Sequence, residues 1–187
     1  MTQSTVTQIP GYIAGTWDID AAHSTVGFSV RHMMVSKVRG YFRDFSGEIV
    51  TAEDPAQSSV TATIDLGSID TRQEQRDAHI RSADFFDVEN HPQMTFRSTG
   101  VRTDGADWVV DGELSLKGNA KPVSLTLELN GFGPDAYGGT RAGFTAKTEI
   151  SRKEFGVDIA MPMDGGGVVV GDKISVELEI EAVLRTA

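Results

Sequence analysis

The sequence lacks cysteine altogether, so neither a disulfide framework nor thiolate chemistry can support the fold or an active site. It has no run of about 20 apolar residues, the length that a helix needs to span a bilayer. Its first ten residues have neither the basic nor the apolar segment of a secretory signal. These absences predict a protein of the reducing cytoplasm whose contact with membranes is transient at most.

Positive charge is also scarce in this chain. The sequence has 17 Lys and Arg residues but 27 Asp and Glu residues, which gives a formal net charge of −10. Such a charge repels the phosphate backbone of DNA and RNA, so we expect no nucleic-acid partner.

The sequence motifs of the common catalytic sites are missing as well. It contains no phosphate-binding loop, dinucleotide fingerprint, nucleophile elbow or paired-histidine zinc helix. Its histidines do not have the three- or four-residue spacing that would place two metal ligands on one helix face. We therefore predict no metal site, no required cofactor and no enzymatic activity.

What the sequence does contain is a regular alternation of apolar and polar residues. Apolar side chains recur at every second position through most of the chain, as at 26–30, 60–66, 123–129 and 174–182. This is the period of strands that bury one face. About eight such segments, joined by short turn-rich connections, predict an all-β fold with antiparallel order. We predict one eight-stranded barrel domain over 15–187, preceded by an N-terminal extension over 1–14.

Three connections have a distinct composition. The segment 70–83 predicts a short helix, in which Thr71 and Glu74 have the spacing of a capping box. Residues 117–120 contain Gly118 and Asn119, which tolerate a positive φ, and predict a hairpin turn. The glycine-rich stretch 161–167 has no helical period and predicts a flexible loop at the barrel rim.

A barrel of about eight strands is just wide enough to be filled by side chains or to enclose one small ligand. Aromatic residues from separate strands share the parity of apolar neighbours and could line one enclosed volume: Phe28, Phe42, Phe45, Phe96, Trp108 and Phe144. Met33 adds an adaptable side chain. The sequence does not decide whether these residues form a packed core or a cavity.

The densest polar cluster lies next to aromatic residues, where Arg76, Asp77 and His79 are followed by Asp84 and Phe85. Two interpretations are open. The cluster could fix a helix onto the barrel end through an Arg–Asp pair, or it could bind the polar head of a ligand whose tail lies inside the barrel. As a catalytic alternative, Asp77 or another nearby carboxylate could hold His79 as a general base acting on a small hydrophobic substrate.

Several short motifs, in order and over nearly the whole chain from Gly15 to Leu184, resemble one known family. They include Trp-Asp-Ile-Asp at 17–20, Arg-Asp-Ala-His-Ile at 76–80, Asp-Phe-Phe-Asp-Val at 84–88 and Ser-Arg-Lys-Glu-Phe-Gly-Val at 151–157. The chain resembles the YceI-like proteins, which are lipocalin-like barrels associated with polyisoprenoid binding. The resemblance implies an elongated apolar pore that holds an isoprenoid or similar amphiphile, no established catalytic residues and often a dimer.

Residues and resemblance together predict two groups of site residues. The predicted pore lining is Phe28, Met33, Phe42, Phe45, Ile64, Phe85, Phe96, Trp108, Phe144 and Phe155. The predicted cluster at the polar head group or barrel end is His23, His32, Arg76, Asp77 and His79.

The predicted function is that of a carrier, storage or sequestering protein for a long apolar lipid, with a polyisoprenoid, a quinone-like molecule or a fatty-chain amphiphile as the bound ligand. Burial of each methylene group stabilises such a complex by about 0.8 kcal/mol. The chain could also form a homodimer. The competing hypotheses are the enzyme that uses Asp77 and His79 and a scaffold that binds protein through an exposed apolar patch.

Overall fold

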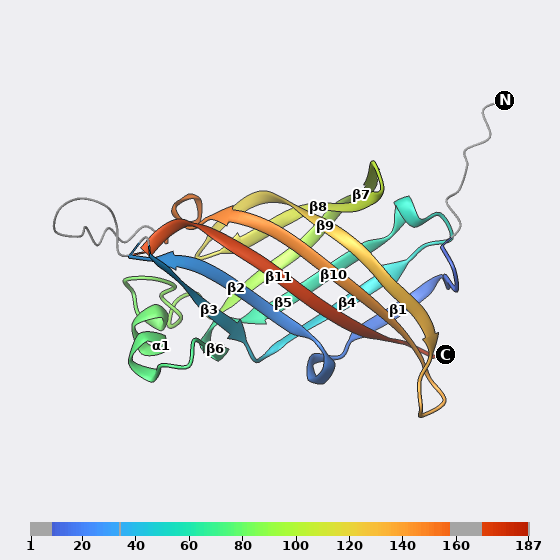
Figure 1. Ribbon diagram of the computed structural model, residues 1–187, viewed down its shortest axis with the longest axis horizontal. Coiled ribbons are helices and arrows are strands. Elements are labelled where there is room, and N and C mark those ends of the chain that lie inside the picture. Colours follow the sequence, from blue (N-terminus) through green and yellow to red (C-terminus); the bar gives the residue numbers. More distant parts are fainter. Residues whose placement is uncertain (1–8, 34, 158–169, 187) are drawn as a thin grey trace.

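The computed structural model describes residues 9–33, 35–157 and 170–186. The predicted rim loop at 161–167 and the first eight residues of the predicted extension lie outside these ranges. Within them, the strands form one antiparallel sheet (Figure 1). The strands are β1 (Gly15–Ile19), β2 (Thr25–His32), β3 (Ser36–Phe42), β4 (Phe45–Thr51), β5 (Ser59–Asp65), β6 (Ile69–Asp70), β7 (Gln93–Asp104), β8 (Asp107–Leu116), β9 (Asn119–Pro134), β10 (Thr140–Ser151) and β11 (Val170–Leu184).

The sheet closes on itself because β1 pairs with β4 on one side and with β11 on the other. Strands β1 and β2 are two halves of one strand, broken by the 3-10 turn η1 (Ala21–His23), and β11 pairs with both halves. A bend likewise divides β3 from β4. The 3-10 turn η3 (Leu66–Ser68) separates β5 from the two-residue β6 in the same way. With each of these three pairs counted as one strand, the structure is a closed eight-stranded antiparallel barrel with one helix, as predicted.

Short turns connect most of the strands, and the predicted hairpin at 117–120 is one of them. Strand β8 ends at Leu116 and β9 begins at Asn119, so Lys117 and Gly118 alone make the turn. Both have a positive φ, 52° and 77°. Two central residues with positive φ match the right-handed twist of the flanking strands, which is why this turn sets the register of the hairpin.

The helix α1 (Glu74–Arg81) covers one end of the barrel, which we call the helix end (Figure 1). It lies within the predicted segment 70–83, but the predicted capping box is wrong. Gln73 is the N-cap, and its side chain accepts a hydrogen bond from the Arg76 amide. Thr71 is unavailable as a cap because its amide and hydroxyl both donate to Asp77, at 2.9 and 2.5 Å.

The barrel wall is parted over one stretch near the helix end. Strands β9 and β10 are paired up to Thr126 and Lys147, but 119–125 of β9 and 148–151 of β10 have no pairing with each other. These segments remain paired to β8 and β11 on their outer sides. A groove of about 380 Å³ lies between them, and its lining includes Val123, Thr148 and Ile150. We call this stretch the β9–β10 seam.

The turn η4 (Arg152–Phe155) follows β10 directly and bridges the seam. The Asn119 side-chain amide donates to the Phe155 carbonyl oxygen at 2.9 Å, and the Lys117 ammonium donates to that of Gly156 at 3.3 Å. Phe155 is 1% exposed and belongs to the larger of two hydrophobic clusters. Its ring therefore packs where the two strands separate.

No helix in the described ranges has the length and apolar content that crossing a membrane requires.

Candidate ligand-binding cavity

The inward-facing side chains of the barrel enclose an apolar cavity of about 320 Å³. Because side chains alternate along a strand, each strand contributes every second residue to this interior. Val26, Phe28 and Val30 of β2 are an example, since all three line the cavity. The volume lies within the usual range of small-molecule pockets, and a nearly all-apolar lining suits a hydrocarbon chain.

The cavity extends along the barrel, since residues from both ends line it. Tyr12 and Phe132 contribute at the end opposite the helix, and Ile80 and Phe85 contribute at the helix end. The Tyr12 hydroxyl donates to the Ala52 carbonyl oxygen at 2.5 Å, which fixes the ring beside the β4–β5 connection. Residues of the predicted N-terminal extension thus form part of the cavity wall.

Most of the predicted pore-lining residues do line this cavity. They are Phe28, Phe42, Phe45, Ile64, Phe85, Phe96, Trp108 and Phe144. These residues come from seven of the labelled strands and from the segment after α1, so the barrel brings together side chains that are far apart in the sequence.

Met33 and Phe155 do not line the cavity, and the structure corrects the prediction for both. Met33 lies in the turn after β2, has a φ of 52° and is 42% exposed. Met33 has the opposite parity from the inward-facing Val30, and it lies in a turn, so strand alternation does not direct it inward. Phe155 lies in η4 and lines the groove of the seam instead of the interior.

Several lining residues escaped the sequence prediction because it concentrated on aromatic side chains. Leu125, Leu127 and Leu129 alternate on β9 and all point inward. Phe132 is aromatic but has the opposite parity from these leucines. The β9–β10 register shifts near Gly143, where an extra residue on β9 turns Phe132 inward. Sequence alternation contains the signal for the leucines but not for the bulge.

An aromatic cluster closes the core at the end opposite the helix. The ring of Phe132 lies 5.4 Å from Tyr12, 5.7 Å from Trp17 and 6.1 Å from Phe144, all in edge-to-face geometry. Trp17 is fully buried, and its indole N–H donates to the Thr51 hydroxyl at 2.8 Å. The cluster makes this end rigid and apolar.

Arg152 is the charged side chain among the residues that line the cavity in the described part of the chain. It is 6% exposed, and its guanidinium donates to the carbonyl oxygens of Val157 at 2.7 Å, Gly171 at 2.9 Å and Val170 at 3.1 Å. No carboxylate of the described residues lies within ion-pair distance of it. Three of its five N–H groups are thus used, all by neutral partners.

The predicted polar cluster does not assemble as one group. Asp77 is buried and accepts both hydrogen bonds from Thr71, while Arg76 donates to the Thr71 hydroxyl at 2.8 Å and to its carbonyl oxygen at 2.7 Å. These contacts fix the first turn of α1 to the segment before it. None of the three polar residues predicted on α1 lines the cavity, whereas Ile80 of the same helix does.

In the enzyme hypothesis, the carboxylate beside His79 is that of Asp84 and not that of Asp77. His79 Nε2 lies 3.0 Å from Asp84 Oδ2, and the His79 ring packs edge-on against Phe85 at 5.0 Å. The Asp77 carboxylate instead faces Thr71. Because α1 places residues 77 and 79 on different sides of the helix, sequence proximity did not produce contact.

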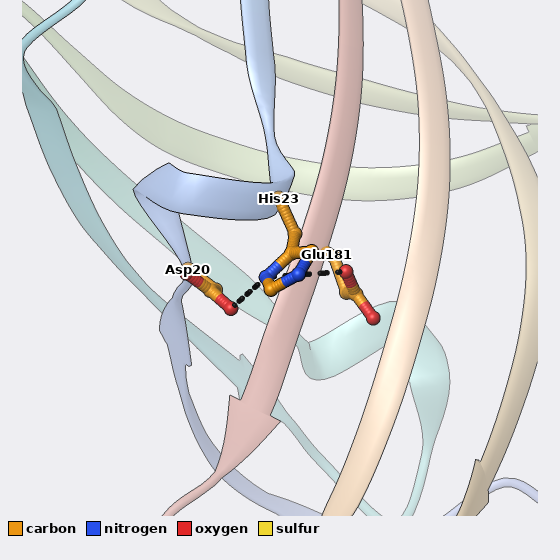
Figure 2. A group of neighbouring side chains, drawn as sticks. All are labelled: Asp20, His23 and Glu181. Atoms are coloured by element: carbon orange, nitrogen blue, oxygen red, sulfur yellow. Dashed lines mark hydrogen bonds and ion pairs between the residues drawn. The ribbon is translucent and has the colours of Figure 1, made fainter. Parts of the chain in front are cut away.

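The two other histidines of the predicted cluster lie apart from α1 and from each other. The full length of β2 separates His23 in η1 from His32. Figure 2 shows His23 between Asp20 and Glu181. Its Nδ1 atom lies 2.7 Å from Asp20 Oδ2 and 4.0 Å from Glu181 Oε2.

This group of three has side-chain types and spacing that a divalent cation could use. A guanidinium already occupies it, however. Arg141 Nη1 lies 2.8 Å from Asp20 Oδ2 and 3.6 Å from Glu181 Oε1. Hydrogen bonds from Arg141 and, next, from His23 lower the pKa of Asp20 from 3.8 to about 2. The arrangement thus ties η1 to β10 and β11 by ion pairs.

Comparison with known proteins agrees with this architecture. The YceI-like domain matches residues 17–182. The chain belongs to the YceI-like family. The protein YceI of Escherichia coli O17:K52:H18 is 43% identical to it over 141 residues, which are 75% of this chain and 74% of that protein. The sequence resemblance to this family is thereby confirmed.

Solved structures of other YceI-like barrels superpose well on this one. BcnA of Burkholderia cenocepacia aligns with a TM-score of 0.75 and 25% identity, covering 87% of this chain and 98% of BcnA. A polyisoprenoid-binding domain of Saccharophagus degradans aligns with a TM-score of 0.67 and 16% identity, covering 92% of this chain and all of that domain. At that identity the second match concerns the fold alone.

Proposed function

We propose that this YceI-like protein binds a long apolar lipid inside its barrel and acts as a carrier or storage protein for it. The observation that supports this most is the elongated cavity, whose wall is built from aliphatic and aromatic side chains. A carrier needs an interior that is apolar and unfilled, and both features are present. The shared fold with a domain described as polyisoprenoid-binding supports the same class of ligand.

The physical basis of binding is transfer of the tail from water to an apolar interior. Each buried methylene group contributes about 0.8 kcal/mol, so a chain of several isoprene units can bind with few polar contacts. Polyisoprenoids, quinone-like lipids and fatty chains share this property. The barrel therefore selects for tail length and thickness more than for chemical detail.

The polar head of the ligand belongs at the helix end, beside Arg152. At the opposite end the cavity is lined by the rings of Tyr12 and Phe132, which pack against each other, and Phe132 also packs on Trp17. Among the described residues, Arg152 uses three of its five N–H groups on carbonyl oxygens. An anionic head group there would gain a charge-assisted hydrogen bond from this guanidinium.

The enzyme hypothesis has no comparable support. Its base, His79, has a carboxylate partner in Asp84, but neither residue lines the cavity, and Asp77 does not line it either. We propose that α1 closes and braces the barrel end, with binding as the function of the whole.

The direct test is extraction of natively purified protein with organic solvent, followed by mass spectrometry of the extract. We expect a prenyl or fatty-chain lipid in stoichiometric amount. Delipidated protein should take up geranylgeraniol delivered from ethanol. A protein that yields no lipid and takes up none would refute the proposal.

A blocking variant links binding to the cavity. Ala146 lies on β10, is 3% exposed and borders the interior. Ala146→Trp should fill the passage and abolish geranylgeraniol uptake. Lys147→Trp, one position along the same strand and exposed, is the matched control and should bind normally. Equal binding by both variants would place the ligand elsewhere.

A further inference from the structure

One segment of this acidic chain has the opposite charge. Residues 21–43 contain four Lys or Arg residues and no Asp or Glu, although the whole chain has a net charge of −10. The segment forms η1, β2 and β3, and the turn between these two strands lies at the helix end of the barrel (Figure 1).

Three of the four cations share the outer face of the β2–β3 hairpin. Arg31 is directly opposite Lys37, and Arg39 is opposite Ser29, two positions further along the same face. All three cations are exposed. Like charges directly opposite each other destabilise a strand pair, so this arrangement costs stability unless an anionic partner offsets it. We call Arg31, Lys37 and Arg39 the cationic strip.

The described carboxylates near the strip form ion pairs or hydrogen bonds with other residues. Asp70 on β6, which pairs with β3, forms an ion pair with Arg43. On β11, Asp172 accepts hydrogen bonds from Ser151 and the Lys153 amide, and Glu177 pairs with Lys147. Among the described residues, no carboxylate lies within ion-pair distance of the strip.

Apolar side chains project beyond the strip. In the turn that connects β2 to β3, Met33 is 42% exposed and Val35 is 86% exposed. Val30, two residues before β2 ends at His32, lines the cavity. The hairpin tip thus combines exposed apolar residues, flanking cations and proximity to the interior. Nucleic acid or an acidic protein would use the cations but would leave the apolar tip unexplained.

We infer that the β2–β3 hairpin is the surface by which this protein docks on an anionic lipid bilayer. The strip contacts the anionic head groups, while Met33 and Val35 enter the boundary between head groups and acyl chains. The acidic remainder of the surface is repelled from the bilayer, which orients the helix end toward it. The inference rests on the proposed function, since docking at this end brings the cavity next to the lipid that it takes up.

The test is co-sedimentation with vesicles of phosphatidylglycerol and phosphatidylcholine at low ionic strength. We expect the protein to bind these vesicles, to leave pure phosphatidylcholine vesicles unbound, and to dissociate in high salt. Lys37→Glu/Arg39→Glu should weaken binding by about tenfold or more, because each cation near the surface contributes measurably. Val35→Asp should also weaken binding, since it places a charge where an apolar group enters.

The matched control is Arg97→Glu/Lys121→Glu, which gives the same net charge by changing exposed cations on β7 and β9. It should bind vesicles like the unmodified protein. Equal loss in both double variants would show a net-charge effect and overturn the inference. Failure of the unmodified protein to bind anionic vesicles would also overturn it. So would normal vesicle binding by Val35→Asp together with DNA binding through the cationic strip.

Uptake of geranylgeraniol from ethanol separates docking from lipid binding. We expect Lys37→Glu/Arg39→Glu to retain this uptake and to lose only transfer from vesicles. Absence of uptake in the unmodified protein would contradict the proposed function, whatever the vesicle result. Normal uptake without vesicle binding would contradict the docking surface alone.

Discussion

At the scale of single residues, Arg152 has the clearest consequence for ligand choice. It is buried, it is the charged side chain in the described part of the cavity lining, and its hydrogen-bond partners there are carbonyl oxygens. For the proposed lipid ligand we expect such a group to discriminate by head group, because an apolar wall treats similar tails alike.

Arg152→Gln is therefore expected to change head-group preference and to leave tail binding intact. The unmodified protein should bind geranylgeranyl phosphate at least about tenfold more tightly than geranylgeraniol, since a hydrogen bond to a charged group contributes about 1.5–3 kcal/mol. The variant should bind both equally, as measured by titration calorimetry. Arg152→Lys should recover part of the preference. A Gln variant that keeps the full preference would contradict this role.

Asp77 is expected to contribute to the stability of the fold. It accepts the Thr71 amide and hydroxyl in a buried position, so Asp77→Ala leaves that amide without a partner. We expect a loss of about 1–3 kcal/mol in the free energy of unfolding, measured by urea denaturation. Asp84→Ala is the control, because Asp84 is an exposed carboxylate whose side chain contacts His79. Equal effects of the two substitutions would argue against the bracing role of Asp77.

The sequence predicted the positions of some site residues correctly and those of others wrongly. Strand parity placed Phe28, Phe96 and Phe144 in the interior, because alternation is a local property. The predictions for Met33 and Phe155 rested instead on an adaptable side chain and on the family resemblance, and both residues lie beyond a strand end, where alternation gives no direction. Arg152 escaped notice because its environment is made by Val157 and Gly171, and a hydrogen bond to a carbonyl has no side-chain signature in sequence.

At the scale of elements, the break between β1 and β2 depends on charge. Asp20 caps η1 through the Ala22 amide and binds Arg141 of β10, so one carboxylate connects the turn to a distant strand. The hydrogen bond from Arg141, followed by that from His23, lowers the pKa of Asp20 from 3.8 to about 2.

This shift predicts a specific dependence of stability on pH. A carboxylate with a lowered pKa stabilises the fold above its ordinary value of 3.8, and this contribution is lost as the pH falls through about 2. Asp20→Asn should lower the melting temperature at neutral pH, and the difference from the unmodified protein should shrink between pH 4 and pH 2. Asp107→Asn, at an exposed position, controls for the loss of one carboxylate. A difference that persists unchanged at pH 2 would be inconsistent with this account.

Elements were predictable where their cause is local. The hairpin at 117–120 was predictable from Gly118, which accepts a positive φ, although the second residue with a positive φ is Lys117 and not Asn119. The start of α1 was misplaced because Thr71 has a tertiary partner, Asp77, that competes with the capping role. The division of β1 from β2 likewise depends on Arg141 and Glu181, more than a hundred residues away.

At the scale of the whole molecule, the barrel leaves its centre unfilled, and this has a thermodynamic cost. The void forgoes packing contacts that a solid core would make. A ligand that binds only the folded state restores such contacts and stabilises the protein by about 2.7 kcal/mol when its concentration is 100 times its Kd.

Delipidated protein should therefore melt at a lower temperature than protein saturated with geranylgeraniol. Scanning calorimetry with increasing ligand should show a continuous rise in melting temperature. The Ala146→Trp variant should show a raised melting temperature without ligand and no further rise with it. A melting temperature indifferent to ligand in the unmodified protein would imply that the cavity stays empty.

The fold class and its closure followed from periodicity, the short connections and the family resemblance. The volume of the interior did not, because it depends on how far inward-facing side chains such as Phe96 and Leu127 reach into the barrel. Alternation gives the direction of each side chain and leaves this reach undetermined.

The β9–β10 seam affects how easily the circumference of the barrel can change. A tube whose strands are bonded all the way round has a fixed circumference, and widening it breaks a row of backbone hydrogen bonds. Here the wall is slit from Thr126 and Lys147 toward the helix end, and a single ring, that of Phe155, fills the slit. Spreading of the two edges displaces that ring and breaks the hydrogen bond from Asn119 to the Phe155 carbonyl oxygen, but it breaks no row of backbone hydrogen bonds. We therefore expect the helix end of the barrel to widen more easily than the other end and to admit thicker or branched tails.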